Sequence, residues 1–171
     1  ALSGAIHPDT IAGHAADALR NLFPSAAVSV GLELAPGAPF SVAASRGDPS
    51  VTPASPFLEE CQRARQSVRW TRPPRLGAPL VAAGHTVGVL VLEGALDTEY
   101  GVADEQVLAA VAAQVSLALQ NARLLTLLSF GKHEWEQMVD AIGAAVCIVD
   151  RHGTVHRANR TFAALVDTPV T

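Results

Sequence analysis

The sequence predicts an α+β fold, an antiparallel sheet of about five or six strands with the N- and C-terminal helices together on one face. The apolar patterns along the 171 residues follow the order helix, two strands, short helix, strand, two-strand hairpin and long helix. Short connections between neighbouring strands favour antiparallel pairing, since parallel strands need a crossover of a dozen or more residues. The segment 86–92 is nearly all apolar, which is typical of a central strand covered on both faces. Helices flanking such a sheet bury their apolar stripes on it.

The N-terminal part of the chain contains one helix and one strand hairpin. Asp9 or Thr10 is expected to cap the helix, and Pro24 ends it. The residues 26–34 alternate between apolar and small or polar side chains, as a strand does. A turn rich in Pro and Gly leads to a second strand at 40–45, and the two strands are predicted to pair.

The middle of the chain supplies the remaining strands. Ser55 followed by Pro56 is the pattern of a helix cap with Pro at the first helical position, and it predicts a short helix to about Gln66. A short strand is expected at 67–71. The strongest hairpin pattern of the chain follows, with strands at 76–82 and 86–92. Its turn contains Gly84, which tolerates the positive φ that tight turns need.

The run 104–130 has no Pro, is rich in Ala, Leu and Gln, and forms the longest helical pattern. At 1.5 Å per residue it is about 40 Å long, more than a domain of this size needs to cover one sheet. One apolar row has heptad-like spacing: Leu108, Val111, Val115, Ala118, Ala122 and Leu125. A second row lies beside it: Val107, Ala110, Leu117, Leu124 and Leu128. Since the sheet can cover only one row, we predict a homodimer, with the first row as its dimer helix.

Two segments together resemble a known family. Residues 79–94, PLVAAGHTVGVLVLEG, followed by 104–125, DEQVLAAVAAQVSLALQNARLL, are similar to the C-terminal half of a GAF domain. The order of elements fits that family over 5–129. The resemblance implies a sensory domain of a bacterial signalling protein, with a ligand cavity whose wall and lid lie near the short helix and the strand after it. It makes Cys61, Arg69, Trp70 and Arg72 candidate pocket residues.

A second resemblance begins after Gly131, which is expected to interrupt the helix before a new helical segment at 134–141. An apolar strand at 145–149, a turn, a short strand and a capped helix resemble the start of a PAS domain. The residues that match its pattern are Val149, Asp150, Gly153, Asn159 and Phe162. The segment amounts to about a third of such a domain, so it is not expected to close a core alone. The predicted divisions are a GAF-like domain at 1–129, a helical connector at 130–141 and a PAS-like fragment at 142–171.

Composition excludes several functional classes. The formal charge of −4 gives no reason to expect nucleic acid as a partner. The longest uncharged apolar runs fall short of about 20 residues, and the first residues lack the pattern of a signal peptide, so neither membrane contact nor secretion is expected. Cys61 and Cys147 lack ligand spacing and are expected to be free thiols of a cytoplasmic protein. The six histidines are scattered, so we predict no catalytic residue and no metal, and no cofactor is required.

The arginine-rich segment is the one concentration of charge. Five arginines fall within 13 residues: Arg63, Arg65, Arg69, Arg72 and Arg75. They are either an anion-receiving mouth of the cavity or a solvated face balanced by Glu59 and Glu60, with the second interpretation favoured. Trp70 is either core filling or a stacking platform, and Cys61 a small buried hydrophobe or a reactive thiol.

The function expected from these patterns is sensory. The chain would bind a small ligand, or relay a signal through a dimeric helix, in a histidine kinase of a two-component system, a diguanylate cyclase or a transcription regulator. The alternative is a structural dimerisation module that holds no ligand. An enzyme is the least favoured interpretation.

Overall fold

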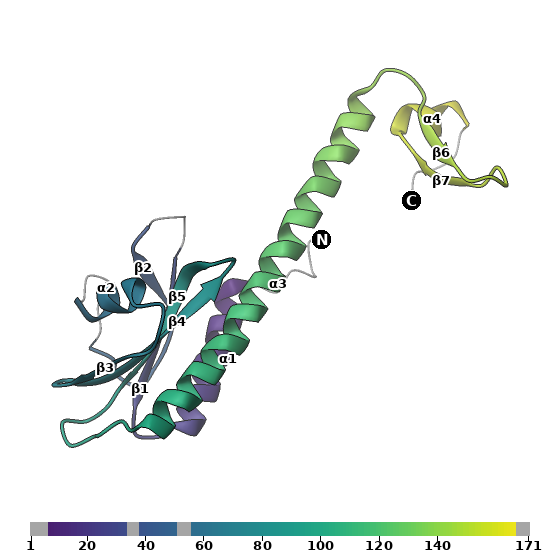
Figure 1. Ribbon diagram of the computed structural model, residues 1–171. Coiled ribbons are helices and arrows are strands. Elements are labelled where there is room, and N and C mark those ends of the chain that lie inside the picture. The colour runs from purple at the N-terminus through teal and green to yellow at the C-terminus, as the bar shows by residue number, and fades with distance from the viewer. Residues whose placement is uncertain (1–6, 34–37, 51–55, 167–171) are drawn as a thin grey trace. The chain divides into compact units, whose positions relative to one another are not determined.

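The structure, a computed structural model, describes residues 7–33, 38–50 and 56–166, except for the side chains of residues 130, 132, 133, 135 and 136. The chain divides into two compact units, Ala1–Arg123 and Leu124–Thr171. Figure 1 shows the elements in chain order. The division falls inside the longest helix, whereas the sequence predicted boundaries near 129 and 141, which stay predictions.

The first unit is built on a five-stranded antiparallel sheet, as predicted. The strands follow the spatial order β2-β1-β5-β4-β3. Their bounds are β1 Ala27–Glu33, β2 Phe40–Arg46, β3 Val68–Thr71, β4 Pro74–Ala82 and β5 His85–Glu93. The central strand β5 pairs with β1 on one side and β4 on the other, and its interior is buried on both faces. This explains why its sequence is apolar without alternation.

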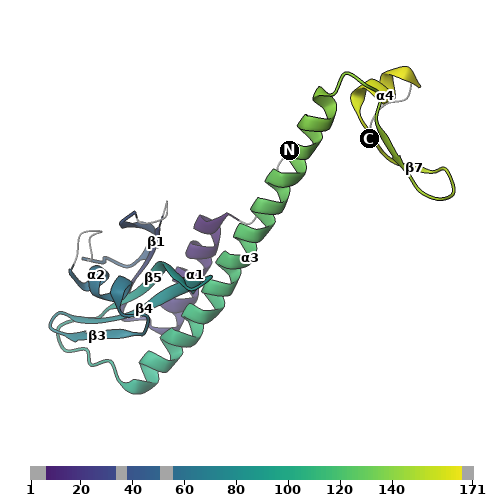
Figure 2. The same ribbon diagram turned by 45° about the horizontal axis from the view of Figure 1, so that its top comes forward.

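Three helices cover the two faces of this sheet. Helices α1 (Pro8–Leu22) and α3 (Val102–Ala141) lie on one face, and α2 (Pro56–Arg63) lies on the other (Figures 1 and 2). The α+β fold class with both long helices on one face is therefore confirmed. The turn between β4 and β5 has positive φ at Ala83 (51°) and Gly84 (80°), the combination that a two-residue type I′ turn needs.

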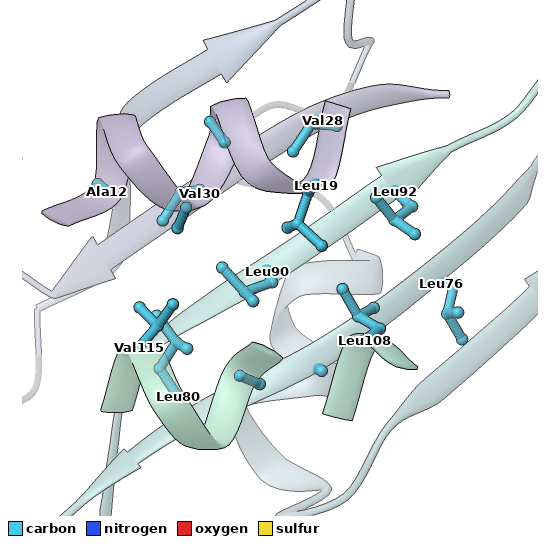
Figure 3. Close-up of a cluster of buried hydrophobic side chains, with 14 of the residues drawn as sticks. Ala12, Leu19, Val28, Val30, Leu76, Leu80, Leu90, Leu92, Leu108 and Val115 are labelled. Atoms are coloured by element: carbon cyan, nitrogen blue, oxygen red, sulfur yellow. The ribbon is translucent and has the colours of Figure 1, made fainter. Parts of the chain in front are cut away.

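The larger core lies between the sheet and the two long helices. Figure 3 shows the side chains that the two long helices and three strands contribute to this core: Leu19 of α1, Val28 and Val30 of β1, Leu76 and Leu80 of β4, Leu90 and Leu92 of β5, and Leu108 and Val115 of α3. All are buried. Burying one such side chain contributes about 1.5–3 kcal/mol, so this core fixes the first stretch of α3 on the sheet.

Two predicted helix boundaries were wrong. Helix α1 begins one residue before Asp9, with Pro8 in its first turn and His7 at the cap position, because Pro is already preset for the first helical position. Helix α3 continues through Gly131 to Ala141 as one helix of 40 residues. A glycine inside a helix costs only about 1 kcal/mol relative to Ala, too little to end a helix with a Leu-rich run before it and Glu, Gln and Met after it. The predicted cap Ser55 lies outside the described residues.

The second unit contains the predicted strand, turn, strand and helix. They are β6 (Cys147–Val149), β7 (Val155–Ala158) and α4 (Arg160–Leu165). The Asp150 carboxylate accepts hydrogen bonds from the backbone N–H of Thr154 (2.9 Å) and His152 (2.8 Å), which closes the turn and holds the pKa of Asp150 below its usual value. Gly153 has φ of 82°. Large apolar side chains of this unit, such as Ile148, Val149 and Leu165, remain exposed.

Candidate functional site

The face of the sheet under α2 is where the family resemblance predicted a ligand cavity. Phe57, Leu58 and Cys61 of α2 are buried there against Val89 and Val91 of β5. They form the smaller core with Phe40 and Val68. The α2 side chains therefore occupy the space directly over the central strands.

Gly77 of β4 lets α2 approach this closely. A Cβ atom at Gly77 would lie 2.5 Å from the Cys61 Sγ and 2.9 Å from the Phe57 Cζ, both well inside normal contact distance. A side chain at this position would push α2 off the sheet. The absence of a side chain at Gly77 therefore lets α2 pack directly on the sheet.

Trp70 of β3 completes the packing at the edge of this core. Its ring meets Phe57 edge-on, with centroids 5.2 Å apart and planes at 77°. The indole Nε1–H donates to the Glu60 carboxylate at 2.8 Å. Both ring and N–H are engaged within the domain, which favours core filling over a stacking platform.

The arginines do not converge on one point. Arg69 and Arg72 are exposed, and Arg69 donates to the backbone carbonyl of Tyr100 at 3.0 Å. Arg63 pairs with Glu59 at 3.0 Å one helical turn away. Arg75 is buried and pairs with Glu93 at 3.3 Å on the neighbouring strand. The solvated-face interpretation suits four of the five, whereas Arg75 serves as a structural ion pair that the sequence analysis did not separate from the others.

Cys61 is fully buried, and burial raises the pKa of its thiol to about 12, with the nearby Glu60 carboxylate adding to the shift. A thiolate is the reactive form of cysteine. The position therefore suits a small buried hydrophobe and not a reactive thiol.

We expect iodoacetamide at pH 8 to label the half-buried Cys147 in the folded protein and to leave Cys61 unmodified. Because the raised pKa favours the neutral thiol in the folded state, its contribution to stability is present below about pH 9 and is lost as the pH rises toward 12. Intact-mass spectrometry should find one adduct in native buffer and two in urea. Rapid labelling of Cys61 in native buffer would show that α2 opens readily.

The described residues also line cavities away from the α2 face. One, of about 280 Å³, is lined by Arg20, Asp48, Glu93 and nearby small residues. Another, of about 400 Å³, is an open groove between α3 and the β4 edge, with Arg65, Val81 and Leu117 among its lining residues. Among the residues that the structure describes, no group of three or more His, Cys, Asp or Glu is placed to hold a metal ion.

Helix α3 contributes both to the core and to the surface. Leu108 and Val115, two members of the row expected to form the dimer helix, are instead buried in the domain's own core, because they face the sheet. Ala122 is also buried, Val111 and Ala118 are half-buried, and Leu125 is exposed. On the same helix, the Ser116 hydroxyl accepts a hydrogen bond from the Val81 N–H at 3.0 Å and donates one to the Ala112 carbonyl at 2.7 Å. This contact holds α3 over the irregularity in β4.

The second row is the exposed one. Val107, Leu117, Leu124 and Leu128 are 40%, 59%, 51% and 70% exposed, and Ala110 is exposed with them. The part Val102–Ser129 is long and apolar enough to cross a membrane by length and composition, although Asp104, Glu105 and Arg123 keep its uncharged runs below about 20 residues. One face of this helix packs on the sheet. The second row, hereafter called the exposed row, is an apolar surface of the helix that remains exposed.

Comparison with known proteins decides the family. Residues 4–120 match the GAF domain family. The chain belongs to the GAF family. GAF domains are regulatory and typically non-catalytic. No curated protein matches this GAF chain.

Solved structures show the same fold at low sequence identity. The GAF domain/HD domain protein from Geobacter sulfurreducens is 19% identical with a TM-score of 0.62, over 72% of this chain and 99% of that chain. The second GAF domain of DevS from Mycobacterium smegmatis is 18% identical with a TM-score of 0.62, over 71% and 99%. A chain of the E. coli DhaR(N)-DhaL complex is 15% identical with a TM-score of 0.61, over 96% of this chain and 65% of that chain. This last match includes the part beyond the GAF domain.

Proposed function

We propose that this GAF chain is the input module of a bacterial signalling protein and works as a homodimer joined through α3. The observation that carries the proposal is the exposed row on a helix whose opposite face is locked into the GAF core. Solved structures of similar fold include a methyl-accepting chemotaxis protein and the GAF domains of two phosphoenolpyruvate-protein phosphotransferases, which supports a regulatory role. A histidine kinase, diguanylate cyclase or transcription regulator would supply the output.

A second copy of the chain suits the exposed row. Its spacing of three, seven, seven and four residues, from Val107 through Ala110, Leu117 and Leu124 to Leu128, follows a heptad seam, which two helices bury against each other. Covering five apolar side chains per subunit contributes on the order of 5–10 kcal/mol before the cost of association. Both copies present the same row, as an isologous interface requires.

The residues after the helix are proposed to begin a PAS-like domain. Support comes from the predicted Asp150 turn, the Asn159 cap and the two short strands. The match to the DhaR(N)-DhaL chain extends over this part as well. A single helix thus leads from the GAF core into the next folded segment.

A ligand-free dimerisation module is the second candidate, and the packed α2 face favours it. Phe57 and Cys61 fill the space over Gly77, so a ligand there needs α2 to move. Native mass spectrometry of the purified protein separates the candidates: a copurifying small molecule supports sensing through the α2 face, and its absence with an intact dimer supports the structural role.

We expect Leu117→Glu together with Leu124→Glu to convert the dimer into a folded monomer, because two carboxylates per subunit would have to be desolvated in the seam. Both side chains are exposed in the single chain, so the fold itself should change by less than about 0.5 kcal/mol each. Light scattering measures the mass, and circular dichroism the fold.

Leu96→Glu is the matched control, since Leu96 is exposed in the loop before α3. It should leave the dimer intact. A wild-type monomer at high micromolar concentration would refute the dimer, and flotation of that monomer with lipid vesicles would assign the exposed row to a membrane.

A further inference from the structure

The second unit is organised around one polar side chain. Among the residues of Leu124–Thr171 whose side chains the structure describes, Asn159 is the one that is buried, at 1% exposure. A buried amide is stabilising only when its hydrogen-bonding groups are satisfied. Asn159 is therefore the buried side chain at which the parts of this unit meet.

The Asn159 amide connects three parts of the unit. Its Nδ2 group donates to the carbonyl of Val139 at 3.1 Å, in the last turn of α3, and to the carbonyl of Ala144 at 2.9 Å, in the segment that follows. Its Oδ1 atom accepts from the N–H of Val146 at 2.9 Å, just before β6, and from the N–H of Phe162 at 2.9 Å, in α4. All four hydrogen-bonding positions of the amide are used.

An ion pair next to this amide repeats the connection. The Asp140 carboxylate in α3 accepts from the backbone N–H of Arg160 at 2.9 Å and pairs with the Arg160 guanidinium at 3.2 Å. A carboxylate at the first turn of α4 is also favoured by the helix dipole. Two adjacent side chains thus tie the C-terminal turn of α3 to the start of α4.

We infer that Asn159 is a positioning residue that joins the end of α3 to the β6–β7–α4 segment, so that the two open and move as one body. The two donor bonds hold the helix end, and the two acceptor bonds hold the segment. A change in α3 then reaches both β6 and α4 through the Asn159 amide, whereas the Asp140–Arg160 pair reaches only the start of α4. The use of this joint as a signal relay rests on the proposed function, but the joint itself does not need the dimer.

The acceptor and donor roles can be separated by substitution. Asn159→Asp keeps an oxygen for Val146 and Phe162 and remains a good helix cap, but it places a carboxylate oxygen against the carbonyls of Val139 and Ala144. Asn159→Ser is neutral, also caps α4, and is too short to reach Val139. Either variant should release α3 while α4 stays folded.

The test uses the full 171-residue chain and measures amide hydrogen exchange at Val146 and Phe162. Glu134 is an exposed residue near the C-terminal end of α3. Glu134→Gly should lower the local equilibrium constant for helix formation about fivefold relative to the matched variant Glu134→Ala. With Asn159 present, the Gly variant should lower protection at both amides several-fold. With Asn159→Asp or Asn159→Ser, the effect of the same helix change should fall below about twofold. This non-additivity is a readout that local stability alone does not produce.

The amides of Gly153 and Thr154 report the fold independently, since both bond to Asp150. The inference is overturned if Glu134→Gly lowers protection at Val146 and Phe162 equally with and without Asn159. It is also overturned if Glu134→Gly has no effect on these amides when Asn159 is present. Loss of protection at Gly153 and Thr154 in both variants would also overturn it, because Asn159 would then hold the segment's own fold. Repeating the measurement in the Leu117→Glu, Leu124→Glu background shows whether a failure belongs to the joint or to the dimer.

Discussion

Replacing Val115 by Glu is expected to unfold the GAF domain, whereas Glu at Leu117, two residues away, is expected to leave it folded. Val115 is 8% exposed and packs in the core between α3 and the sheet, while Leu117 is 59% exposed. A buried carboxylate without a partner costs about 4–5 kcal/mol or more, a large share of the 5–15 kcal/mol that holds a typical domain.

Urea denaturation followed by circular dichroism measures both changes. The Val115→Glu protein should be largely unfolded in buffer or have a much lower midpoint, and the Leu117→Glu protein should stay folded, with a midpoint like that of the Leu117→Glu, Leu124→Glu monomer. If Val115→Glu stays folded and only the dimer is lost, the first row faces a partner as the sequence predicted, and the position of α3 on the sheet is wrong.

The two rows of α3 show what sequence could and could not predict. Both have apolar residues at helical spacing, so periodicity predicts two apolar surfaces without saying which faces the sheet. Leu108 and Val115 turn inward because the sheet approaches that side, and Ser116 fixes the rotation of the helix by its bond to Val81. Such a contact between residues 35 positions apart is not visible in local pattern.

The order of elements along the chain and the hairpins were predictable because their signals are local. The Gly84 turn, the apolar β5 and the Asp150 turn each carry their own chemistry within a few residues. The candidate site was less predictable. Five arginines in one segment look alike in sequence, yet the structure buries Arg75 beside Glu93 and leaves Arg72 in solvent. The role of Gly77 depends on α2 lying above it, which is a tertiary relation.

Gly77→Ala should destabilise the GAF domain by about 1–3 kcal/mol, whereas Gly131→Ala, beyond that domain, should stabilise helix α3. At Gly77 the added methyl overlaps the Cys61 Sγ and the Phe57 ring, and overpacking of a filled core carries that cost. Nothing lies within 4 Å of a Cβ at Gly131, where Ala is favoured over Gly by about 1 kcal/mol in a helix.

Thermal denaturation of the two variants and of Gly77→Ala combined with Cys61→Ala provides the measurement. Removing the Cys61 sulfur should recover part of the loss at Gly77, because the two groups compete for one space and their effects are then not additive. A neutral Gly77→Ala would mean that α2 stands away from β4 in solution. In that case the α2 face is an open pocket, and ligand sensing there becomes favoured over the ligand-free module.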